Sequence, residues 1–344
     1  MSNACLVVTT EEGGLDRYSQ ELAKRLPVKR IETRRYLSTR EHFRLARLLS
    51  SLKSVAHLPN QHFGRFALSL KVPFVITVHD LARFKISFTR ETLRERVGLW
   101  LDKKGIRKAA MILAVSEYTK RDLVSFLRIP PQKVMVIYNG IDHAIFRFRN
   151  ENPFDFPYII YVGSERPRKN LDRLLEAFAT VRRCFPELKL VKAGTEGRSM
   201  EFRARTLRKV AELGLRGEVI FLEHVSDEEL ARYYSGALLL AYPSLYEGFG
   251  IPLLEAMACG CPVVASNTTS LPEVAGDAAI LVNPYQVDEI AEAMRMVIKD
   301  EDLRARLIAR GLERARAFSW SKTAEETHRV YQKLEAMSSS TTSP

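Results

Sequence analysis

The amino-acid sequence predicts an α/β protein made of two doubly wound domains, each built on a parallel sheet. Short β-branched runs alternate with longer segments in which apolar residues recur three and four positions apart. This alternation stops once, between residues 140 and 157, and then starts again. The length of 344 residues is large for a single core and suits two domains.

The first domain is expected to span residues 1–147. Helices are predicted over 15–26 and 117–127, where the apolar residues follow the helical period. Strands are predicted at six runs rich in β-branched residues, which are 4–10, 28–32, 55–59, 73–79, 111–116 and 133–139. Residues 140–157 contain a glycine, two prolines and no apolar period, which is typical of a linker between domains.

The second domain is expected to span residues 148–317. Its predicted strands are 158–163, 188–194, 218–222, 237–244, 262–266 and 278–283, and residues 170–185 have the period of a helix. Two successive doubly wound domains imply a ligand cleft between them, at the carboxyl ends of their strands. The last residues, 336–344, are rich in serine and threonine and are expected to form a disordered tail.

Positive charge is concentrated in the first half of the chain. The net charge is +12, and residues 1–150 hold 28 Lys and Arg against 13 Asp and Glu. Such an excess fits nucleic acid, anionic lipid and phosphate ligands equally well. Within it, residues 38–54 interleave arginines with Phe43 and several leucines. This segment is predicted either to lie on anionic lipid or to pack on the sheet through its leucines.

The sequence contains no apolar run of about 20 residues, the length that a membrane-spanning helix needs. The first residues also lack the basic region and the cleavage site of a signal peptide, so we expect a cytoplasmic protein. The four cysteines do not predict a disulfide framework. Cys259 and Cys261 have no partner residues for a zinc site, while Cys5 and Cys184 are expected in the core.

Each half has a predicted strand that runs into a glycine turn and then into a helix. In the first half the turn contains Gly13 and Gly14, and in the second it contains Gly163, Arg168 and Lys169. Helix N-termini bind anions, glycine allows close approach, and the cations add contacts, so the second turn suits a diphosphate. Neither turn is a dinucleotide fingerprint or a P-loop. Either turn alone is better explained as a solvated surface loop, but two turns that face one cleft favour an anion site.

The stretch YEGFGIPLLEAMACGCPVVAS places Glu247 in a glycine loop and Glu255 in the helix that Pro252 begins. One carboxylate can accept hydrogen bonds from sugar hydroxyls and the other from a ribose, with phosphates at the helix N-terminus between them. This predicts a nucleotide-sugar site. Favourable first-turn electrostatics also explain Glu255, and paired acids occur in hydrolases, although a glycosidase does not need two anion-binding turns.

Several segments resemble the retaining GT-B glycosyltransferases of glycosyltransferase family 4. They include EEGGLDRYSQEL, VITVHDL, YVGSERPRKNLDRLLEAF and the stretch that contains Glu247, so the resemblance covers nearly the whole chain. It implies two Rossmann-like domains that face a cleft, the first for the acceptor and the second for the nucleotide-sugar donor. It also implies that a helix over 318–335 returns to the first domain.

The resemblance also implies roles for individual residues. Lys169 and Arg168 would hold the diphosphate beside Gly163, and Gly14 would approach it from the first domain. Glu247 would orient the donor sugar, and Glu255 would bind the ribose. The loop that supplies backbone amides to the donor would consist of Gly248, Phe249, Gly250 and Ile251.

His79, at a strand end, would contact the donor sugar near the reacting carbon, although it could equally have a structural role. Many relatives have arginine after the glycine of the second turn, where this chain has Ser164, so Arg166 or Arg168 would replace it. Lys169, Arg168 and the helix N-terminus can stabilise the leaving phosphate, so no metal and no cofactor beyond the donor is expected.

The resulting expectation is a hexosyltransferase that retains anomeric configuration, with a mannosyltransferase of polysaccharide or glycolipid synthesis as one form. Its acceptor would be a saccharide or a lipid-linked saccharide, and its basic first domain would contact an anionic membrane. Nucleic acid is not an expected partner, because the anion-binding signals lie in turns rather than in aromatic-interleaved basic stripes. The alternatives are a nucleotide-sugar epimerase, a glycoside phosphorylase, and a non-catalytic basic protein that binds membranes or nucleic acid.

Overall fold

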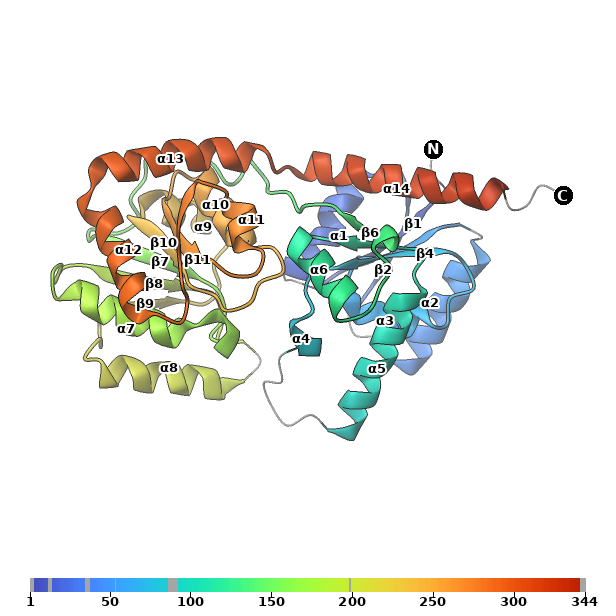
Figure 1. Cartoon of the computed structure of the whole chain (residues 1–344), viewed down its shortest axis with the longest axis horizontal. Helices are drawn as coiled ribbons and strands as arrows, with labels where there is room; N and C mark the ends of the chain where they lie inside the picture. The colour runs from blue at the N-terminus through green and yellow to red at the C-terminus, as the bar shows by residue number, and fades with distance from the viewer. Residues whose placement is uncertain are drawn as a thin grey trace. The chain divides into compact units, whose positions relative to one another are not determined.

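The computed structural model describes residues 3–11, 14–34, 38–52, 54–85, 92–197 and 199–340. The chain divides into two compact units (Figure 1). Unit 1 consists of Met1–Gly140 with Ser319–Pro344, and unit 2 of Ile141–Phe318. The first domain was expected to end at residue 147, but unit 1 leaves off at Gly140, seven residues earlier. The reason is that the segment after Gly140 packs on unit 2. Phe146 in this segment is buried, with its ring 6.4 Å from that of Tyr234.

Unit 1 is a parallel six-stranded sheet with the order β2-β1-β3-β4-β5-β6. The strands are β1 (Cys5–Thr9), β2 (Lys29–Thr33), β3 (Ala56–Leu58), β4 (Phe74–Val78), β5 (Met111–Ala114) and β6 (Val134–Val136). The helices are α1 (Gly14–Arg25), α2 (Thr39–Ser51), α3 (Gly64–Ala67), α4 (Ala82–Lys85), α5 (Leu93–Lys108), α6 (Glu117–Ser125) and α14 (Trp320–Ser340), with short 3₁₀ turns η1 (Gln61–Phe63) and η2 (Pro131–Lys133). Hydrophobic clusters cover both faces of this sheet, as parallel pairing requires.

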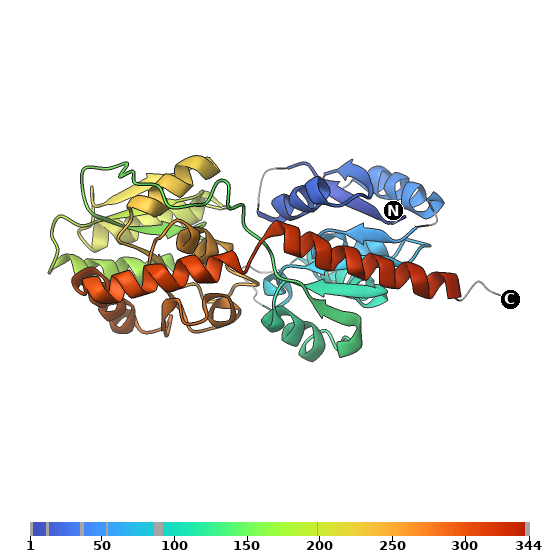
Figure 2. The same cartoon turned by 90° about the horizontal axis from the view of Figure 1, so that it is seen from above.

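Helix α14 completes the core of unit 1 although it comes last in the chain. Trp320 and Tyr331 are buried against α1, and the Thr323 hydroxyl donates a hydrogen bond to the Tyr138 carbonyl at 2.7 Å. A side chain at Gly140 would lie 2.0 Å from the Trp320 nitrogen, so only glycine fits where the helix begins. Figure 2 shows α14 lying along unit 1. The helix continues to Ser340, so 336–340 are not the disordered tail expected, and 341–344 lie outside the described residues.

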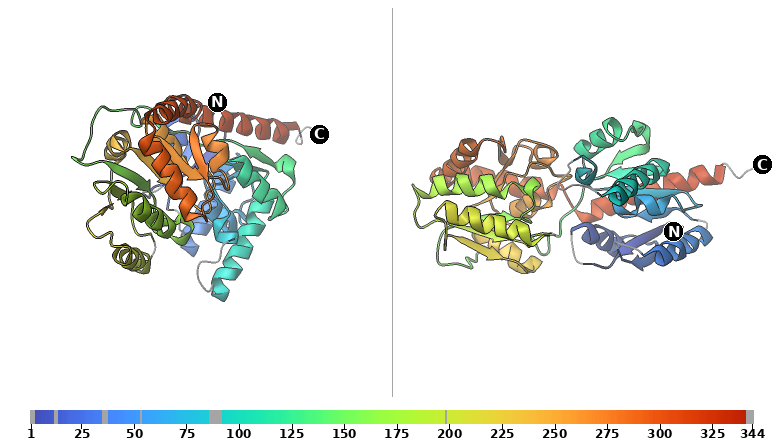
Figure 3. Two further views of the ribbon diagram at one scale, coloured as in Figure 1. Left: turned by 60° about the vertical axis from the view of Figure 1, so that its left-hand side comes forward. Right: turned by 90° about the horizontal axis from the view of Figure 1, so that it is seen from below.

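Unit 2 is a second parallel six-stranded sheet, with the order β12-β11-β10-β7-β8-β9. The strands are β7 (Tyr158–Val162), β8 (Lys189–Ala193), β9 (Val219–Leu222), β10 (Leu239–Tyr242), β11 (Val263–Ser266) and β12 (Ala279–Val282). The helices are α7 (Leu171–Arg182), α8 (Met200–Glu212), α9 (Asp227–Gly236), α10 (Ile251–Ala258), α11 (Leu271–Ala275), α12 (Val287–Lys299) and α13 (Glu301–Arg316), with a 3₁₀ turn η3 (Pro167–Lys169). In Figure 3, α7 and α8 lie side by side in green and yellow-green.

Each sheet has a point where the order of the strands reverses. In unit 2 this point lies between β7 and β10, because β8 and β9 follow on one side and β11 and β12 on the other. The two strands are in register at Ile159 and Leu239. At such a point, loops leave neighbouring strands in opposite directions and open a crevice at their carboxyl ends. The loops after β7 and β10 contain Lys169 and Glu247, respectively.

The structure confirms the predicted fold class, and each of the twelve predicted strands overlaps an observed strand. One expectation about the core is wrong. Cys184 is exposed, because α7 ends at Arg182, three residues earlier than predicted, and the chain turns away from the core there. Cys5, Cys259 and Cys261 are buried.

Candidate functional site

The loop after β7 has a fixed shape that is set by Asn170. This residue adopts a left-handed conformation, with φ 60° and ψ 33°, which asparagine tolerates better than most residues. Its buried amide donates hydrogen bonds to the carbonyls of Pro243 at 2.8 Å and Pro284 at 2.7 Å. Asn170 therefore joins the loop after β7 to the loops after β10 and β12, and fixes where Arg168 and Lys169 begin.

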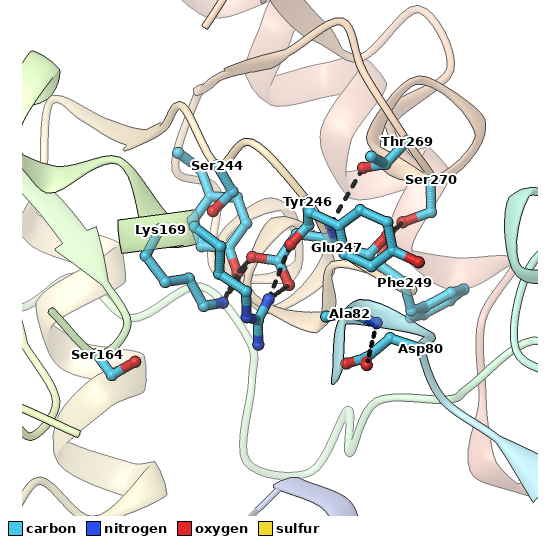
Figure 4. Close-up of polar contacts among 12 residues, drawn as sticks. Asp80, Ala82, Ser164, Lys169, Ser244, Tyr246, Glu247, Phe249, Thr269 and Ser270 are labelled. Atoms are coloured by element: carbon cyan, nitrogen blue, oxygen red, sulfur yellow. Dashed lines mark hydrogen bonds and ion pairs between the residues drawn. The ribbon is translucent and has the colours of Figure 1, made fainter. Parts of the chain in front are cut away.

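Two cations converge on Glu247 (Figure 4). Lys169 Nζ lies 2.6 Å from Glu247 Oε1, and Arg168 Nη1 lies 3.2 Å from Oε2. The Tyr242 hydroxyl, at the end of β10, accepts a hydrogen bond from Lys169 at 2.8 Å and donates one to Glu247 Oε1 at 3.0 Å. Arg168 also donates to the Tyr246 carbonyl at 2.8 Å. The Arg, Lys and Glu residues of the sequence motif therefore form one cluster in unit 2, in which Glu247 is buried and the two cations are partly buried.

The charges of this cluster hold Glu247 ionised. Burial alone would raise the pKa of the Glu247 carboxyl, but the Lys169 ammonium and the Arg168 guanidinium outweigh burial and lower it to about 2. Near neutral pH the side chain is therefore a hydrogen-bond acceptor only. An acceptor of this kind can hold sugar hydroxyls, whereas it cannot serve as a general acid, which would need a raised pKa.

The backbone around Glu247 is held from the loop that follows β11. The Thr269 hydroxyl accepts a hydrogen bond from the Glu247 amide at 3.2 Å. The buried Ser270 hydroxyl contacts the carbonyls of Glu247 at 3.1 Å and Phe249 at 2.8 Å. Because a trans peptide points its amide away from its carbonyl, the amides of Gly248 and Gly250 point away from Ser270. Sequence reasoning missed Thr269, Ser270 and Tyr242.

Helix α10 begins in the way that the sequence predicts. Gly250 precedes it with φ 110°, and a side chain there would lie 2.6 Å from Leu271 Cδ2, so glycine is required. Ile251 and Pro252 form the first turn. Glu255 follows one turn later and is buried, with Oε2 accepting a hydrogen bond from the Tyr234 hydroxyl at 3.3 Å. The proposed ribose contact of Glu255 stays a prediction.

A second ionic cluster surrounds the residue after Ser164. The Glu165 Oε1 atom, in the loop after β7, lies 3.0 Å from Nζ of Lys192 on β8 and 2.7 Å from Nε of Arg203 on α8. Burial lowers the pKa of Lys192, and Glu165 partly offsets this. These two cations are committed to Glu165. Arg168, one of the two arginines proposed to replace the one missing at Ser164, directly contacts Glu247.

In unit 1, His79 is buried just after β4. Its Nε2 atom donates a hydrogen bond to the Pro59 carbonyl at 2.9 Å, and its amide donates to Gln61 Oε1 at 3.1 Å. The Tyr18 ring packs edge-on against the imidazole, with centroids 4.9 Å apart. The loop after β3 therefore fixes the imidazole at a carboxyl strand end. These contacts suit both a structural role and a substrate contact.

A buried chain of hydrogen bonds runs behind His79. Tyr18 and His57 both contact the Thr77 hydroxyl, at 3.1 and 2.8 Å, and His57 Nδ1 lies 2.6 Å from the Tyr331 hydroxyl of α14. Burial lowers the pKa of His57 to about 3, so the imidazole is neutral. Nothing in the sequence distinguished His57 from other strand residues.

Gly14 is the first residue of α1, and Gly13 lies outside the described residues. Gly163 follows β7 directly, and a side chain there would lie 3.3 Å from the Tyr161 hydroxyl and 3.6 Å from Lys169 Cδ. Within the described ranges, no three His, Cys, Asp or Glu side chains are grouped so that they could hold a metal ion. No described helix is both long and apolar enough to cross a membrane.

Two family profiles match the chain. Residues 142–314 match the family described as glycosyl transferases group 1, and residues 4–145 match glycosyltransferase family 4. Together with the two doubly wound units, these matches define the protein as a glycosyltransferase of the GT-B fold. The chain belongs to glycosyltransferase family 4.

The matching proteins include curated mannosyltransferases. The O-antigen chain mannosyltransferase B of Escherichia coli is 31% identical over 76% of this chain and 70% of its own length. The MMP alpha-(1->4)-mannosyltransferase of Mycolicibacterium hassiacum is 33% identical over 84% of this chain and 74% of its own. The chain spans 63% of a D-inositol 3-phosphate glycosyltransferase from Nocardioides, at 32% identity. These matches support a transferase over the epimerase and binding-protein alternatives.

Solved structures confirm the fold. Sucrose-phosphate synthase from Thermosynechococcus elongatus superposes with a TM-score of 0.81 at 22% identity, covering 98% of this chain and 100% of that chain. HepE from Anabaena, in complex with UDP-glucose, also has a TM-score of 0.81, at 16% identity over 97% of this chain and 100% of its own.

Proposed function

We propose that the protein transfers a hexose from a nucleoside-diphosphate sugar to a saccharide or lipid-linked saccharide, with retention of anomeric configuration. The cluster of Arg168, Lys169, Glu247 and Tyr242 at the switch point of unit 2 carries this proposal. It combines two cations, which suit a diphosphate, with one ionised acceptor, which suits sugar hydroxyls. The UDP-glucose complex of HepE, which has the same fold, supports a donor of this class.

Each member of the cluster has a proposed task. Lys169 and Arg168 bind the diphosphate, and they stabilise the charge that grows on the β-phosphate as the sugar leaves. Glu247 accepts hydrogen bonds from the donor sugar, assisted by the loop that starts at Gly248 and includes Phe249. Ser270 and Thr269 keep that loop in place before the donor binds, so little reorganisation accompanies the reaction.

In the proposed reaction, the bond from the anomeric carbon to the β-phosphate oxygen breaks while an acceptor hydroxyl oxygen bonds to the same carbon. The acceptor attacks from the face that the phosphate leaves, through an oxocarbenium-like state. The acceptor proton passes to the leaving phosphate oxygen. No covalent glycosyl-enzyme intermediate is required, and both oxygens of the Glu247 carboxylate are already paired, one with Lys169 and the other with Arg168.

The remaining parts of the proposal concern the donor and the setting. Mannosyl donors are favoured because the names of several curated relatives specify mannosyl transfer.

His79 is proposed to contact the donor sugar, Glu255 its ribose, and Gly14 its diphosphate. No metal and no further cofactor is proposed, because the cations of the chain suffice for the leaving group. The reaction is placed in the cytoplasm, at the inner face of the membrane when the acceptor is lipid-linked.

A donor panel tests this proposal. The protein is incubated with UDP-, GDP-, ADP- and dTDP-hexoses, with and without EDTA, and its thermal shift and slow donor hydrolysis are measured. One donor should stabilise the protein and be hydrolysed, and proton NMR of the first-formed sugar should show the anomeric configuration of the donor. An inverted first product would overturn retention, and failure of every donor to bind would overturn the proposed function.

A further inference from the structure

Lys192 lies at a position where a parallel strand normally holds an apolar residue. It is the fourth residue of β8, in register with Tyr161 of β7 and Phe221 of β9, and its side chain is completely buried. The inner strands of a parallel sheet are covered on both faces, and burying an ammonium group costs free energy unless the group is fully paired. Packing alone therefore does not explain this lysine.

The Lys192 ammonium group uses its three donors on two different loops. It donates hydrogen bonds to the carbonyls of Gly194 and Thr195 in the loop after β8, the second at 3.0 Å. Its third contact is Glu165 Oε1 at 3.0 Å, in the loop after β7. The two loops also touch directly, because a side chain at Gly194 would lie 2.9 Å from the Gly163 carbonyl oxygen. Lys192 therefore joins the loop after β7 to the loop after β8.

Arg203 of α8 extends these contacts to a third loop. Its Nε atom donates to Glu165 Oε1 at 2.7 Å, and its Nη1 atom donates to Oε1 of Glu223, directly after β9, at 2.7 Å. The guanidinium also stacks over the Phe221 ring, 4.7 Å from its centre. Two acids and two bases, Glu165, Glu223, Lys192 and Arg203, thus form one network without net charge, which we call the Glu165 network. It connects the ends of three neighbouring strands (Figure 1).

Stability does not account for the Glu165 network. The free-energy cost of burying charges is about as large as their mutual attraction, and apolar replacements of similar volume are often equally stable. Within the described residues, Glu165 Oε2 is also buried without a hydrogen-bond partner, which lowers stability further. A network that adds little net stability but fixes three loops is better explained by what those loops hold.

The network anchors the loop after β7 on one side of its two cations. Glu165 lies three positions before Arg168 and ties the loop to those after β8 and β9. Asn170 follows Lys169 and ties the same loop to those after β10 and β12. Pro167 stiffens the short segment between the first anchor and the cations, because its ring fixes φ. A shift of either anchor therefore moves both cations.

We propose that the Glu165 network positions Arg168 and Lys169 against the β-phosphate of the donor. Its members act as positioning residues, through the loop, so that both cations meet the phosphate without reorganisation. This inference rests on the proposed function, because it assigns the network to the diphosphate contact of that reaction. Loss of the network should therefore weaken the binding of a nucleoside diphosphate more than that of the matching monophosphate.

A comparison of two nucleotides measures this positioning. Titration calorimetry gives the affinity of the nucleoside diphosphate that binds the protein, relative to the matching monophosphate. In Glu165→Gln combined with Lys192→Met, two opposite charges are removed at similar volume, so the melting temperature should be kept. The relative affinity should fall about tenfold, because the β-phosphate contact is loosened. In donor hydrolysis KM should rise and kcat should fall, each about tenfold, since charge on the β-phosphate grows in the transition state.

The matched control is a similar triad at the opposite end of β8. Glu218 lies 3.0 Å from Arg182 and 3.7 Å from Lys189, the first residue of the strand. Glu218→Gln combined with Lys189→Met should keep the relative affinity of the unchanged protein. Arg203→Met, at a partly exposed side chain, provides a second test of the network and should show the same selective loss.

A folded network variant that keeps the relative affinity would overturn the inference, and so would an equal loss in the control. Both results leave the proposed function standing. If the unchanged protein binds no nucleoside diphosphate, the proposed function itself fails, and the inference fails with it.

Discussion

Lys169 and the buried Glu247 form an ion pair across the switch point of the second sheet, with Nζ 2.6 Å from Oε1. The two residues come from loops after neighbouring strands, 78 positions apart in the chain. Breaking such a pair usually destabilises a protein, because one charge stays buried without its partner. A diphosphate can compete for the cation while sugar hydroxyls compete for the carboxylate. The pair is therefore suited to be opened by one molecule that carries both groups.

Replacing Glu247 separates binding from transfer. Glu247→Gln preserves the shape of the side chain and removes its charge, so we expect kcat to fall at least about 100-fold while nucleoside-diphosphate affinity is kept or raised. Glu247→Ala should also abolish transfer. Steady-state kinetics and titration calorimetry measure the two effects. Full turnover in either variant would contradict the role of Glu247.

Acid should weaken the fold through the same carboxylate. The folded-state pKa of Glu247 is lowered from 4.5 to about 2. The ionised carboxylate therefore contributes its full share to the free energy of unfolding above pH 4.5, and this contribution is lost as the pH falls toward about 2. The shift corresponds to roughly 3 kcal/mol. The difference in unfolding free energy between the unchanged protein and Glu247→Gln should shrink over this window. A constant difference down to the lowest pH at which both proteins fold would be incompatible with the ion pair.

Thr269 has a strained backbone that serves the site. Its φ of 58° is unfavourable for a β-branched residue. The Thr269 hydroxyl nevertheless accepts a hydrogen bond from the Glu247 amide. In Thr269→Gly the relief of strain offsets the lost hydrogen bond, so the unfolding free energy should stay within about 1 kcal/mol. The value of kcat/KM should fall about tenfold. Thr269→Ser, which restores the hydroxyl, should recover activity. An active glycine variant would show that the hydroxyl does not position Glu247.

His57 predicts a second, separate pH effect in unit 1. Burial lowers its folded-state pKa from 6.5 to about 3, so the unfolded chain binds a proton that the folded chain does not. The free energy of unfolding is therefore at its full value above pH 6.5 and falls by about 1.4 kcal/mol per pH unit below it. His57→Gln should remove this slope between about pH 6.5 and about pH 5. Urea unfolding of both proteins measures it, and equal slopes would rule out a buried neutral His57.

Much of the fold could be predicted from the sequence, because parallel strands are buried on both faces and appear as β-branched runs. Strands β7 and β11 are examples of such runs, and the glycine turn that follows β7 indicates a ligand site. The domain boundary was less predictable. Residues 141–147 have the composition of a linker, yet Phe146 packs on unit 2. This packing depends on tertiary contacts that the local sequence does not reveal.

The charged residues of the site could be predicted from the sequence, whereas the residues that hold them in position could not. Arg168 and Lys169 lie in a glycine turn ahead of a predicted helix, Glu247 lies in a glycine loop, and a buried charge needs a partner. Tyr242, Thr269 and Ser270 are ordinary residues at strand ends, and their contribution depends on side chains that meet only after folding.

The central claim is that the diphosphate of a donor binds to Lys169 and Arg168 in unit 2. Calorimetric titration of UDP, GDP, ADP and dTDP into the unchanged protein and into Lys169→Ala tests it most directly. One nucleotide should bind the unchanged protein, and Lys169→Ala should bind it at least about 100-fold more weakly, because a buried charge-assisted contact is lost. Equal affinity in the two proteins, with both folded, would contradict the account.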